Sequence, residues 1–316
     1  MVMFHGVIPP SVTLFHADQG IDWDGTLHQL DALLAAGVHG VFALGTAGEW
    51  TQLSIHERKE YAQRVVERVN RRVPVIIGTG GVSTQETIEL TRHAQGVGAD
   101  AAAVVTPFYQ RLDDAQVLAH FGAVANAVNL PIVVYNIPQF TGTAISTPVL
   151  AQLASENDNI VGVKDAWDSA VLLRSRILTI KGMRPDFAVL TGIPEQFIGL
   201  LMMGGDGGVF GEMNFAPAPF VNCYEAYRRG DYEAARLHFG EILRVASAIQ
   251  VPGYFQATIK EAMRALGQTE SATVRLPGTA ILPDVQAQVR RNLEALGLLR
   301  TPVVVGDAPA DEAAGD

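Results

Sequence analysis

Cysteine is nearly absent from this chain of 316 residues, in which Cys223 is the only one. A single cysteine excludes a disulfide within the chain and favours a reducing compartment, so the cytoplasm is the expected location. Basic residues are also in the minority, with 23 Lys and Arg against 33 Asp and Glu and a formal net charge of -10. This acidic balance argues against nucleic acid or an anionic membrane as a partner.

Long hydrophobic runs are missing as well. Each apolar stretch is interrupted by Gly, Pro or a charged residue before it could span a bilayer. The first residues lack a basic segment followed by an apolar stretch, so no signal peptide is expected. The eight histidines are scattered without His-x-His or His-Glu-x-x-His spacing, and we therefore expect no catalytic metal.

The chain does contain eight short apolar runs, spaced roughly 20–35 residues apart, which is the size of a βα unit. The runs are residues 6–9, 40–44, 73–77, 101–105, 132–135, 160–164, 187–191 and 208–211. Helix-start signals lie between them, at Ser54, Ser83, Asp113, Thr147-Pro148 and Asp168. Eight alternating units predict a parallel sheet closed into a (β/α)8 TIM barrel, in preference to an open doubly wound sheet.

The C-terminal part of the chain has a different pattern. From Ala216 to Leu299 the periodicity is only helical. We therefore expect residues 1–225 to form the barrel and residues 226–300 to form a C-terminal helical extension. Residues 301–316 are small, acidic and contain proline, which predicts a disordered tail.

Lys164 is the most informative residue, because it ends the apolar run that begins at Ile160. A strand buried on both faces is a poor place for a cation. Two interpretations are open: the amine lies at the strand end in solvent or an ion pair, or burial keeps it neutral as a nucleophile toward a carbonyl. Taken alone, the residue favours the structural interpretation, because most perturbed lysines are structural.

Several reactive side chains stand where the strands of such a barrel end, which is the face that carries the chemistry. They include Thr46, Tyr109, Tyr135 and Lys164. An amine, phenols and hydroxyls suit carbonyl chemistry, whereas the paired carboxylates of a glycosidase are not found. The tyrosines alone could be core aromatics. The glycines at 78–81 and 204–208 could cradle phosphate, but they lack a P-loop Lys-Ser/Thr, and tight turns explain them more simply.

Three segments resemble the signatures of the dihydrodipicolinate synthase / N-acetylneuraminate lyase family. They are Gly45-Thr-Ala-Gly-Glu49, Tyr135-Asn-Ile-Pro-x-x-Thr-Gly142 and Val161-Gly-Val-Lys-Asp-Ala166, within a likeness over roughly residues 5–300. The family comprises pyruvate-dependent class I aldolases built on a (β/α)8 barrel. The resemblance therefore reverses the interpretation of Lys164, which becomes the expected Schiff-base lysine.

The resemblance also implies a role for each matching residue. Lys164 would form an imine with the 2-keto carbon of pyruvate, so no separate cofactor is expected. Tyr135 would act as general acid/base, and Thr46 would relay protons to it. Tyr109 would cross a dimer interface into the neighbouring site, within a homotetramer made of two dimers. The N–H groups of Thr46 and Ala47 would hold the pyruvyl carboxylate.

Two departures from the family pattern bear on the substrate. Phe140 stands where dihydrodipicolinate synthases carry an arginine that grips the carboxylate of aspartate semialdehyde. A bidentate contact of that kind is worth roughly 1.5–3 kcal/mol, so its loss argues against that substrate. In some relatives a polar pocket binds lysine as a feedback inhibitor. The corresponding positions here are Trp50, Ile55, Arg58, Val82 and Phe108. This set is too apolar for an amino-acid site, so we predict no inhibition by lysine.

The segments 40–53, 71–81 and 204–217 resemble most the branch of 2-keto-3-deoxy sugar-acid aldolases, which release pyruvate and glyceraldehyde from the gluconate or galactonate acid. Phe140 and Gly192 are expected in the substrate site. The candidates for contacts to substrate hydroxyls are Thr143, Asp165, Thr191, Glu195 and Asn214. Dihydrodipicolinate synthase, N-acetylneuraminate lyase and a sugar-acid dehydratase stay open as alternatives. A non-catalytic barrel is disfavoured by the intact set Lys164, Tyr135, Thr46 and Tyr109.

Overall fold

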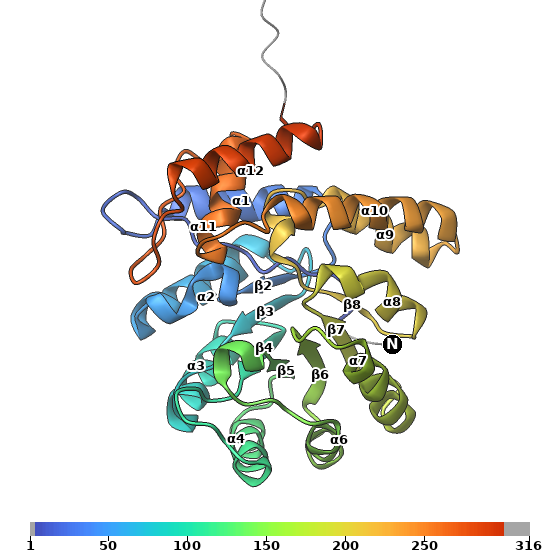
Figure 1. Cartoon of the computed structure of the whole chain (residues 1–316). Coiled ribbons are helices and arrows are strands. Elements are labelled where there is room, and N and C mark those ends of the chain that lie inside the picture. The colour runs from blue at the N-terminus through green and yellow to red at the C-terminus, as the bar shows by residue number, and fades with distance from the viewer. Residues whose placement is uncertain (1–3, 300–316) are drawn as a thin grey trace, which may run out of the picture.

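A closed barrel forms the centre of the computed structural model, which describes residues 4–299. Eight parallel strands make one sheet in the order β1-β8-β7-β6-β5-β4-β3-β2. A parallel bridge between Pro10 and Phe42 joins the two edges, and the Phe42 N–H donates to the carbonyl of Pro9 at 3.0 Å. Helices surround the strands on all sides (Figure 1). The predicted (β/α)8 barrel is therefore confirmed, while the tail 301–316 lies outside the described residues.

All eight strands overlap the apolar runs that predicted them. They are β1 (Gly6–Val7), β2 (Val41–Ala43), β3 (Val75–Gly78), β4 (Ala101–Val105), β5 (Ile132–Asn136), β6 (Ile160–Asp165), β7 (Ala188–Thr191) and β8 (Gly207–Gly208). Strand β8 is shorter than predicted, because the chain turns at Gly211 into the 3-10 turn η5 (Gly211–Asn214). A Cβ atom at Gly207 would lie 2.0 Å from the carbonyl oxygen of Gly6, so glycine is what lets β8 pair closely with β1.

The helices of the barrel alternate with these strands. They are α1 (Trp23–Ala35), α2 (Ile55–Val69), α3 (Thr84–Gly96), α4 (Asp114–Asn126), α5 (Pro138–Thr141), α6 (Thr147–Glu156), α7 (Ala170–Arg176), α8 (Phe197–Met202) and α9 (Ala218–Arg228). Short 3-10 turns are η1 (Thr46–Gly48), η2 (Trp50–Gln52) and η4 (Pro194–Gln196), and η3 (Ile177–Lys181) is a π-helical turn. The chain then continues as α10 (Tyr232–Ala248), α11 (Phe255–Ala265) and α12 (Pro283–Ala295).

The helix starts follow the capping residues seen in the sequence. Ser54 and Glu57 form a capping box at α2, because each side chain accepts from the other residue's backbone N–H. Ser83 caps α3, and Asp113 caps α4. The start of α7 lies one residue later than predicted, since Ser169, and not Asp168, accepts from the third helical N–H.

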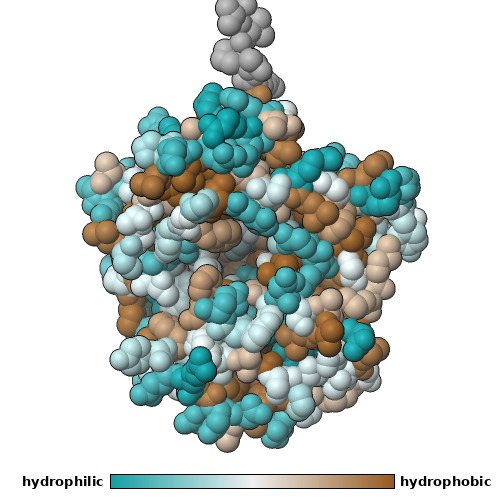
Figure 2. Space-filling view, in the orientation of Figure 1, coloured by the Kyte–Doolittle hydropathy of each residue, from teal (hydrophilic) through white to brown (hydrophobic). Residues whose placement is uncertain are grey.

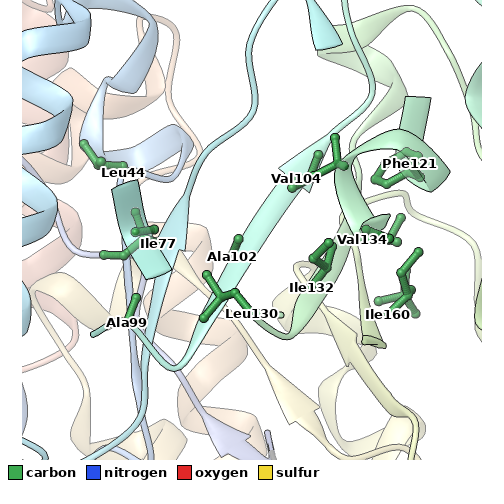
Figure 3. Close-up of a cluster of buried hydrophobic side chains, with 14 of the residues drawn as sticks. Leu44, Ile77, Ala99, Ala102, Val104, Phe121, Leu130, Ile132, Val134 and Ile160 are labelled. Carbon is green, nitrogen blue, oxygen red and sulfur yellow. The ribbon is translucent and has the colours of Figure 1, made fainter. Parts of the chain in front are cut away.

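Two apolar layers stabilise the barrel. Side chains that point inward from the strands fill its centre, among them Phe42, Val105, Tyr135 and Leu190. Those that point outward pack under the surrounding helices, as Figure 3 shows for residues from Leu44 to Ile160. A third cluster joins α9–α12 to the side of the barrel at β1 and α8. Each strand is thus buried on both faces, which explains why the strands read as continuous apolar runs.

An irregularity in β6 decides which way Lys164 points. Ile132 of β5 pairs with Ile160, but the next residue, Val133, pairs with Gly162, so Val161 is an extra residue in the ladder. Such a bulge reverses the inward and outward alternation of every residue that follows it. Because of it Lys164 lies opposite Tyr135 in register, and each residue stands one position before the end of its strand, at the barrel mouth.

Candidate active site

The amine of Lys164 is buried among aromatic rings. The residue is 5% exposed, and its Nζ lies 4.0 Å from the ring centroid of Tyr135 and 4.9 Å from that of Phe42. Within residues 4–299, no carboxylate oxygen lies within 4.0 Å of this nitrogen. Burial lowers the pKa of Lys164 to about 7, because the charged form loses its hydration without gaining a counter-ion. A large fraction of the amine is therefore neutral near neutral pH.

The neighbouring carboxylate, Asp165, is used elsewhere. Successive residues of a strand point to opposite faces, so Asp165 points away from the barrel centre. There its carboxylate pairs with the buried Arg176 at 3.2 Å and accepts from the Asn136 side chain at 2.7 Å. Asp165 is fully buried in this network, which corrects its assignment as a contact for substrate hydroxyls. The same arrangement keeps a negative charge away from Lys164.

Tyr135 and Thr46 form a pair of hydroxyl groups above Lys164. The Tyr135 Oη and the Thr46 Oγ1 lie 3.2 Å apart, and either can donate to the other. Burial raises the pKa of Tyr135 to about 12, so the phenol is protonated at rest. The sequence predicted these three residues as one constellation, and the structure brings them together.

The turn after β2 presents backbone N–H groups at the same place. Its first internal hydrogen bond runs from the Gly48 N–H to the Gly45 carbonyl, so the N–H groups of Thr46 and Ala47 have no acceptor within the turn. Left-handed residues flank the turn, with φ of 57° at Leu44 and 54° at Glu49. A left-handed conformation is costly for residues other than glycine, so contacts with the surrounding protein must stabilise this turn.

Gly192 and Asn214 differ in their placement. A Cβ atom at Gly192 would lie 3.2 Å from the Cε of Lys164, so the missing side chain leaves room beside the amine. Asn214 is buried, and its side-chain amide donates to the carbonyls of Pro10 and Gly211 while its oxygen accepts from the Val12 N–H. The structure therefore assigns Asn214 to bracing the loop after β1, and not to the substrate contact that was expected.

The remaining candidates for hydroxyl contacts are mostly engaged by the protein. Thr143 is buried and accepts from the Leu112 N–H, and Thr191 is buried and accepts from the Ile193 N–H. The carboxylate of Glu195 accepts from Gln250 at 3.1 Å. Short polar residues at strand ends are commonly used to satisfy nearby backbone groups, and these threonines follow that rule.

Tyr109 and Phe140 lie near the mouth and are largely exposed. Tyr109 is 95% exposed and has a left-handed backbone with φ of 81°, which is unusual for an aromatic residue. A side chain so exposed contacts little of its own chain, and the structure does not bring it to the Thr46–Tyr135 pair. Phe140, on α5, is 64% exposed.

A cavity of about 550 Å³ opens at the mouth beside Thr46. Its wall is largely aromatic and is built from four segments, with Trp50, Phe108, Phe140, Tyr254 and Phe255 as the large side chains. Figure 2 shows this face of the molecule hollowed near its centre. A concave, mostly apolar space next to groups with perturbed pKa values is typical of a substrate site.

The sequence did not predict that the start of α11 and the loop before it would form part of the site. Gln256 donates to the carbonyl of Thr46 at 2.9 Å, and the Gln52 amide donates to the Tyr254 hydroxyl at 2.9 Å. The two contacts join the start of α11 to the successive turns η1, which carries Thr46, and η2. The break at Pro252-Gly253, just before α11, was the available signal, because it marks a chain turn ahead of a helix start.

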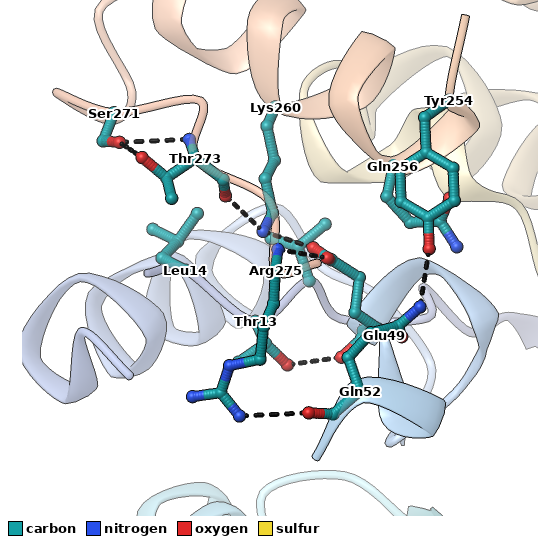
Figure 4. A network of polar contacts seen from close by, with 12 residues as sticks. Thr13, Leu14, Glu49, Gln52, Tyr254, Gln256, Lys260, Ser271, Thr273 and Arg275 are labelled. Atoms are coloured by element: carbon teal, nitrogen blue, oxygen red, sulfur yellow. Dashed lines mark hydrogen bonds and ion pairs between the residues drawn. The ribbon is translucent and has the colours of Figure 1, made fainter. Parts of the chain in front are cut away.

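A buried ion pair strengthens the same junction (Figure 4). The Lys260 Nζ lies 2.5 Å from the Glu49 Oε1 and donates to the Thr273 carbonyl at 2.9 Å. The second carboxylate oxygen of Glu49 accepts from the backbone N–H of Arg275 at 3.0 Å. Glu49 is the left-handed residue that ends the Thr46 turn, so this network holds the turn in shape.

The positions that correspond to a lysine feedback site are filled by a structural arginine. Arg58 is 3% exposed, lies over the Trp50 ring at 4.6 Å and donates to the carbonyl of Gly80 at 2.7 Å. It also pairs with Glu86 at 3.3 Å. A buried cation at this position repels a bound ammonium group, so the absence of lysine inhibition stays our prediction.

In the described part of the chain, residues 4–299, no group of three or more His, Cys, Asp or Glu residues is arranged to hold a metal ion. Over the same residues no helix has both the length and the hydropathy needed to cross a membrane.

Comparison with known proteins places this site in a family. The model of the dihydrodipicolinate synthetase family matches residues 3–296. YagE of Escherichia coli K12, provisionally named a 2-dehydro-3-deoxy-D-gluconate aldolase, is 40% identical over 94% of this chain and 98% of its own. YjhH of the same organism, provisionally named a 2-dehydro-3-deoxy-D-pentonate aldolase, is 34% identical over 95% of this chain and 99% of its own.

Solved structures agree with these matches. A crystal structure of YagE in complex with pyruvate superposes with a TM-score of 0.91, at 40% identity, covering 94% of this chain and 100% of that one. The dihydrodipicolinate synthase of Acinetobacter baumannii, also in complex with pyruvate, gives a TM-score of 0.87 at 29% identity, covering 94% of this chain and 100% of that one.

The (β/α)8 fold and these relatives together show that the protein is a lyase of the class I aldolase type. The chain belongs to the dihydrodipicolinate synthetase family, in which its similarity to YagE and YjhH places it with the branch of 2-keto-3-deoxy sugar-acid aldolases.

Proposed function

We propose that the protein reversibly cleaves a 2-keto-3-deoxy sugar acid of the gluconate or galactonate type into pyruvate and an aldehyde such as glyceraldehyde. The observation that carries the proposal is the buried amine of Lys164, whose pKa burial lowers to about 7 and which faces Tyr135 with no carboxylate within 4.0 Å among residues 4–299. A neutral amine is what attack on a keto carbon requires. The names of YagE and YjhH support the choice of a deoxy sugar acid.

In the proposed reaction, the Lys164 Nζ attacks the 2-keto carbon, and loss of one water gives a protonated imine. The C3–C4 bond then breaks, and its electron pair moves through C2 to the imine nitrogen to give an enamine. The C4 hydroxyl becomes the aldehyde as its proton passes to Tyr135. Protonation of C3 and hydrolysis of the imine release pyruvate and restore the lysine.

Tyr135 and Thr46 would move the proton together. The phenol has a pKa of about 12, so a free phenolate at neutral pH would be costly. A relay would let Tyr135 receive the substrate proton while it passes its own proton to Thr46, 3.2 Å away, and Thr46 in turn would release its hydroxyl proton to water in the open cavity that it lines. The free N–H groups of Thr46 and Ala47 would hold the carboxylate of the pyruvyl unit, and Tyr109 would complete the site of a second copy in a homotetramer.

Two measurements test this function. Borohydride reduction in the presence of pyruvate should add a stable pyruvyl group to Lys164 in wild-type protein and none in Lys164→Ala, as read by peptide mass. Pyruvate release should then be assayed with 2-keto-3-deoxygluconate, 2-keto-3-deoxygalactonate and N-acetylneuraminate, and condensation with pyruvate and aspartate semialdehyde.

Cleavage of a deoxy sugar acid that is lost in Lys164→Ala is the expected result. Efficient condensation with aspartate semialdehyde instead would make the protein a dihydrodipicolinate synthase, and would mean that another cation replaces the arginine missing at Phe140. Loss of water without pyruvate release would identify a dehydratase. Failure to trap pyruvate at Lys164 would refute the Schiff-base mechanism.

A further inference from the structure

A polar residue follows each of the two side chains that face one another in the barrel. Asn136 comes after Tyr135 on β5, and Asp165 comes after Lys164 on β6. Asn136 and Asp165 are also partners in register, and the Asn136 amide donates to the Asp165 Oδ1 at 2.7 Å. Because successive residues of a strand point to opposite faces, this pair lies on the helix side of the two strands, behind the reactive pair.

Arg176 and Ile145 close these contacts into a ring. The Arg176 Nε donates to the Asp165 Oδ2 at 3.2 Å, and its Nη2 donates to the Ile145 carbonyl at 2.5 Å. The backbone N–H of Ile145 donates in turn to the Asn136 Oδ1 at 3.1 Å. We call these four residues the polar ring. It joins the ends of β5 and β6 to α7 and to the segment before α6, and its side chains from Asn136, Asp165 and Arg176 are buried.

The apolar pattern of β6 does not by itself specify how the strand pairs with β5. Both of its faces carry apolar residues, so a shift by one position would exchange one apolar face for another. For Lys164 the same shift would turn the amine from the barrel centre to the helix side. The hydrogen bond between Asn136 and Asp165 requires the two strand ends to lie opposite each other, and it therefore selects the observed register.

The charges of the polar ring cancel one another. Asp165 and Arg176 are both 0% exposed, and a buried ion pair of this kind seldom stabilises a protein more than apolar side chains of similar volume would. What such a pair can add is a single arrangement of the groups around it, because any other arrangement leaves a buried charge without a partner. The ring thus orders the strand ends without placing a net charge behind the amine.

We propose that Asn136, Asp165 and Arg176 are positioning residues, which hold β5 and β6 in the register that sets the Lys164 amine against the Tyr135 ring. The inference rests on the proposed function and deepens it, since these residues act through Lys164 and do not touch the substrate. If the polar ring is opened, the end of β6 relaxes and water reaches the amine. The basicity of Lys164 should then move back toward that of an ordinary lysine.

The test follows borohydride trapping of pyruvate at Lys164 against pH in the double variant Asp165→Leu with Arg176→Met. Both charges leave together, so a change in the profile reports geometry and not an uncompensated charge. We expect the apparent pKa of trapping to rise by about one unit or more, which lowers the rate at pH 6 by about 10-fold. The kcat of cleavage should fall by about 10-fold with a smaller change in KM, because orientation is lost.

Two single variants keep the test decisive if the double variant does not fold. Asn136→Ala leaves the Asp165–Arg176 ion pair intact and should shift the trapping profile in the same direction by a smaller amount. Arg176→Lys keeps a cation that can donate to both acceptors, and its profile should remain close to that of the wild type. An unchanged profile and kcat in the folded fraction of both Asn136→Ala and the double variant would reduce the polar ring to a structural role.

Lys181→Met is the matched control. It breaks the partly buried pair of Lys181 with Asp206, 2.6 Å apart, which lies just before β8 at the end of the barrel opposite to the mouth. This variant should lose stability but keep the wild-type trapping profile. An equal shift in Lys181→Met would attribute the effect to general loosening and overturn the inference alone. Absence of trapping in the wild type would overturn the proposed function with it.

Discussion

Lys164 and Lys260 are both buried, but their surroundings are opposite. Lys164 faces the rings of Tyr135 and Phe42, with no carboxylate within ion-pair distance among the described residues. Lys260 has no exposed surface, yet its Nζ lies 2.5 Å from the Glu49 carboxylate. Burial lowers the pKa of both amines, to about 7 for Lys164 and to about 8 for Lys260, and in Lys260 Glu49 acts in the opposite direction by raising it.

The comparison shows that burial alone does not prepare an amine for chemistry. An ammonium group held by a carboxylate and a carbonyl is favoured in its charged form, which has no lone pair to offer. The aromatic surroundings of Lys164 favour the neutral form instead. The counter-ion therefore separates a lysine that braces the site from one that we expect to react in it.

Replacing each lysine by methionine should separate the roles of Lys164 and Lys260 most clearly. Lys164→Met keeps the length of the side chain but removes the amine. We expect kcat/KM to fall by about 10³-fold or more, because the covalent route is lost. Trapping of pyruvate should disappear, while the midpoint of thermal unfolding should stay the same or rise. Residual cleavage within about 10-fold of wild type would contradict the role of Lys164.

Lys260→Met should have the reverse effect. Removing one partner of a buried pair leaves an uncompensated charge on Glu49, which costs about 3–5 kcal/mol of unfolding free energy. Denaturant unfolding measures that loss, and pyruvate should still be trapped at Lys164 in the folded fraction. Adding Glu49→Gln should recover part of the stability, because the buried charge is then removed. Loss of trapping with full stability would mean that Lys260, and not Lys164, carries the reactive amine.

Local patterns in the sequence predicted most of the fold. Each strand is buried on both faces and therefore appears as an apolar run, and the capping residues Ser54, Ser83 and Asp113 mark helix starts. The reactive set could be predicted because strand ends of a barrel converge. Lys164 and Tyr135 meet in register, although the bulge at Val161 that orients Lys164 leaves no signature in the sequence.

Long-range pairings could not be predicted in this way. Glu49 and Lys260 are separated by 211 positions, and the sequence around each residue does not indicate that it pairs with the other. Asp165 and Asn214 were expected to contact substrate because they follow strands. Both instead satisfy buried groups of the protein, since a polar residue at a strand end can turn toward either the cavity or the backbone.

The dependence on pH should sharpen the contrast between the lysines. The pKa of Lys164 is lowered to about 7, so the neutral amine is lost as the pH falls through that value. Between pH 8 and pH 6 we expect the initial rate of pyruvate trapping to fall by about 10-fold. Between about pH 7 and 10.5 the unfolded chain binds this proton and the folded one does not, so unfolding free energy should rise with pH.

Lys260→Met is the matched control for this profile. Lys260 is not one of the residues whose rings surround the Lys164 amine. The apparent pKa of pyruvate trapping in Lys260→Met should therefore remain near 7. The rise of stability between pH 7 and 10.5 should persist in part in this variant and should be smallest in Lys164→Met. A trapping rate that does not depend on pH would mean that the amine is already neutral at pH 6.

The smallest expected effect concerns the turn that Glu49 and Lys260 hold. Thr46→Val keeps the shape of the side chain and the contact from Gln256 to the Thr46 carbonyl, but removes the hydroxyl near Tyr135. Losing one hydrogen bond of about 0.5–1.5 kcal/mol should lower kcat by about 2–10-fold. Thr46→Ser should restore most of it, and the rate of pyruvate trapping should change little in either variant. If Thr46→Val slowed trapping and cleavage equally, the hydroxyl would serve to seat the pyruvyl group, and the proton relay through Thr46 would have to be given up.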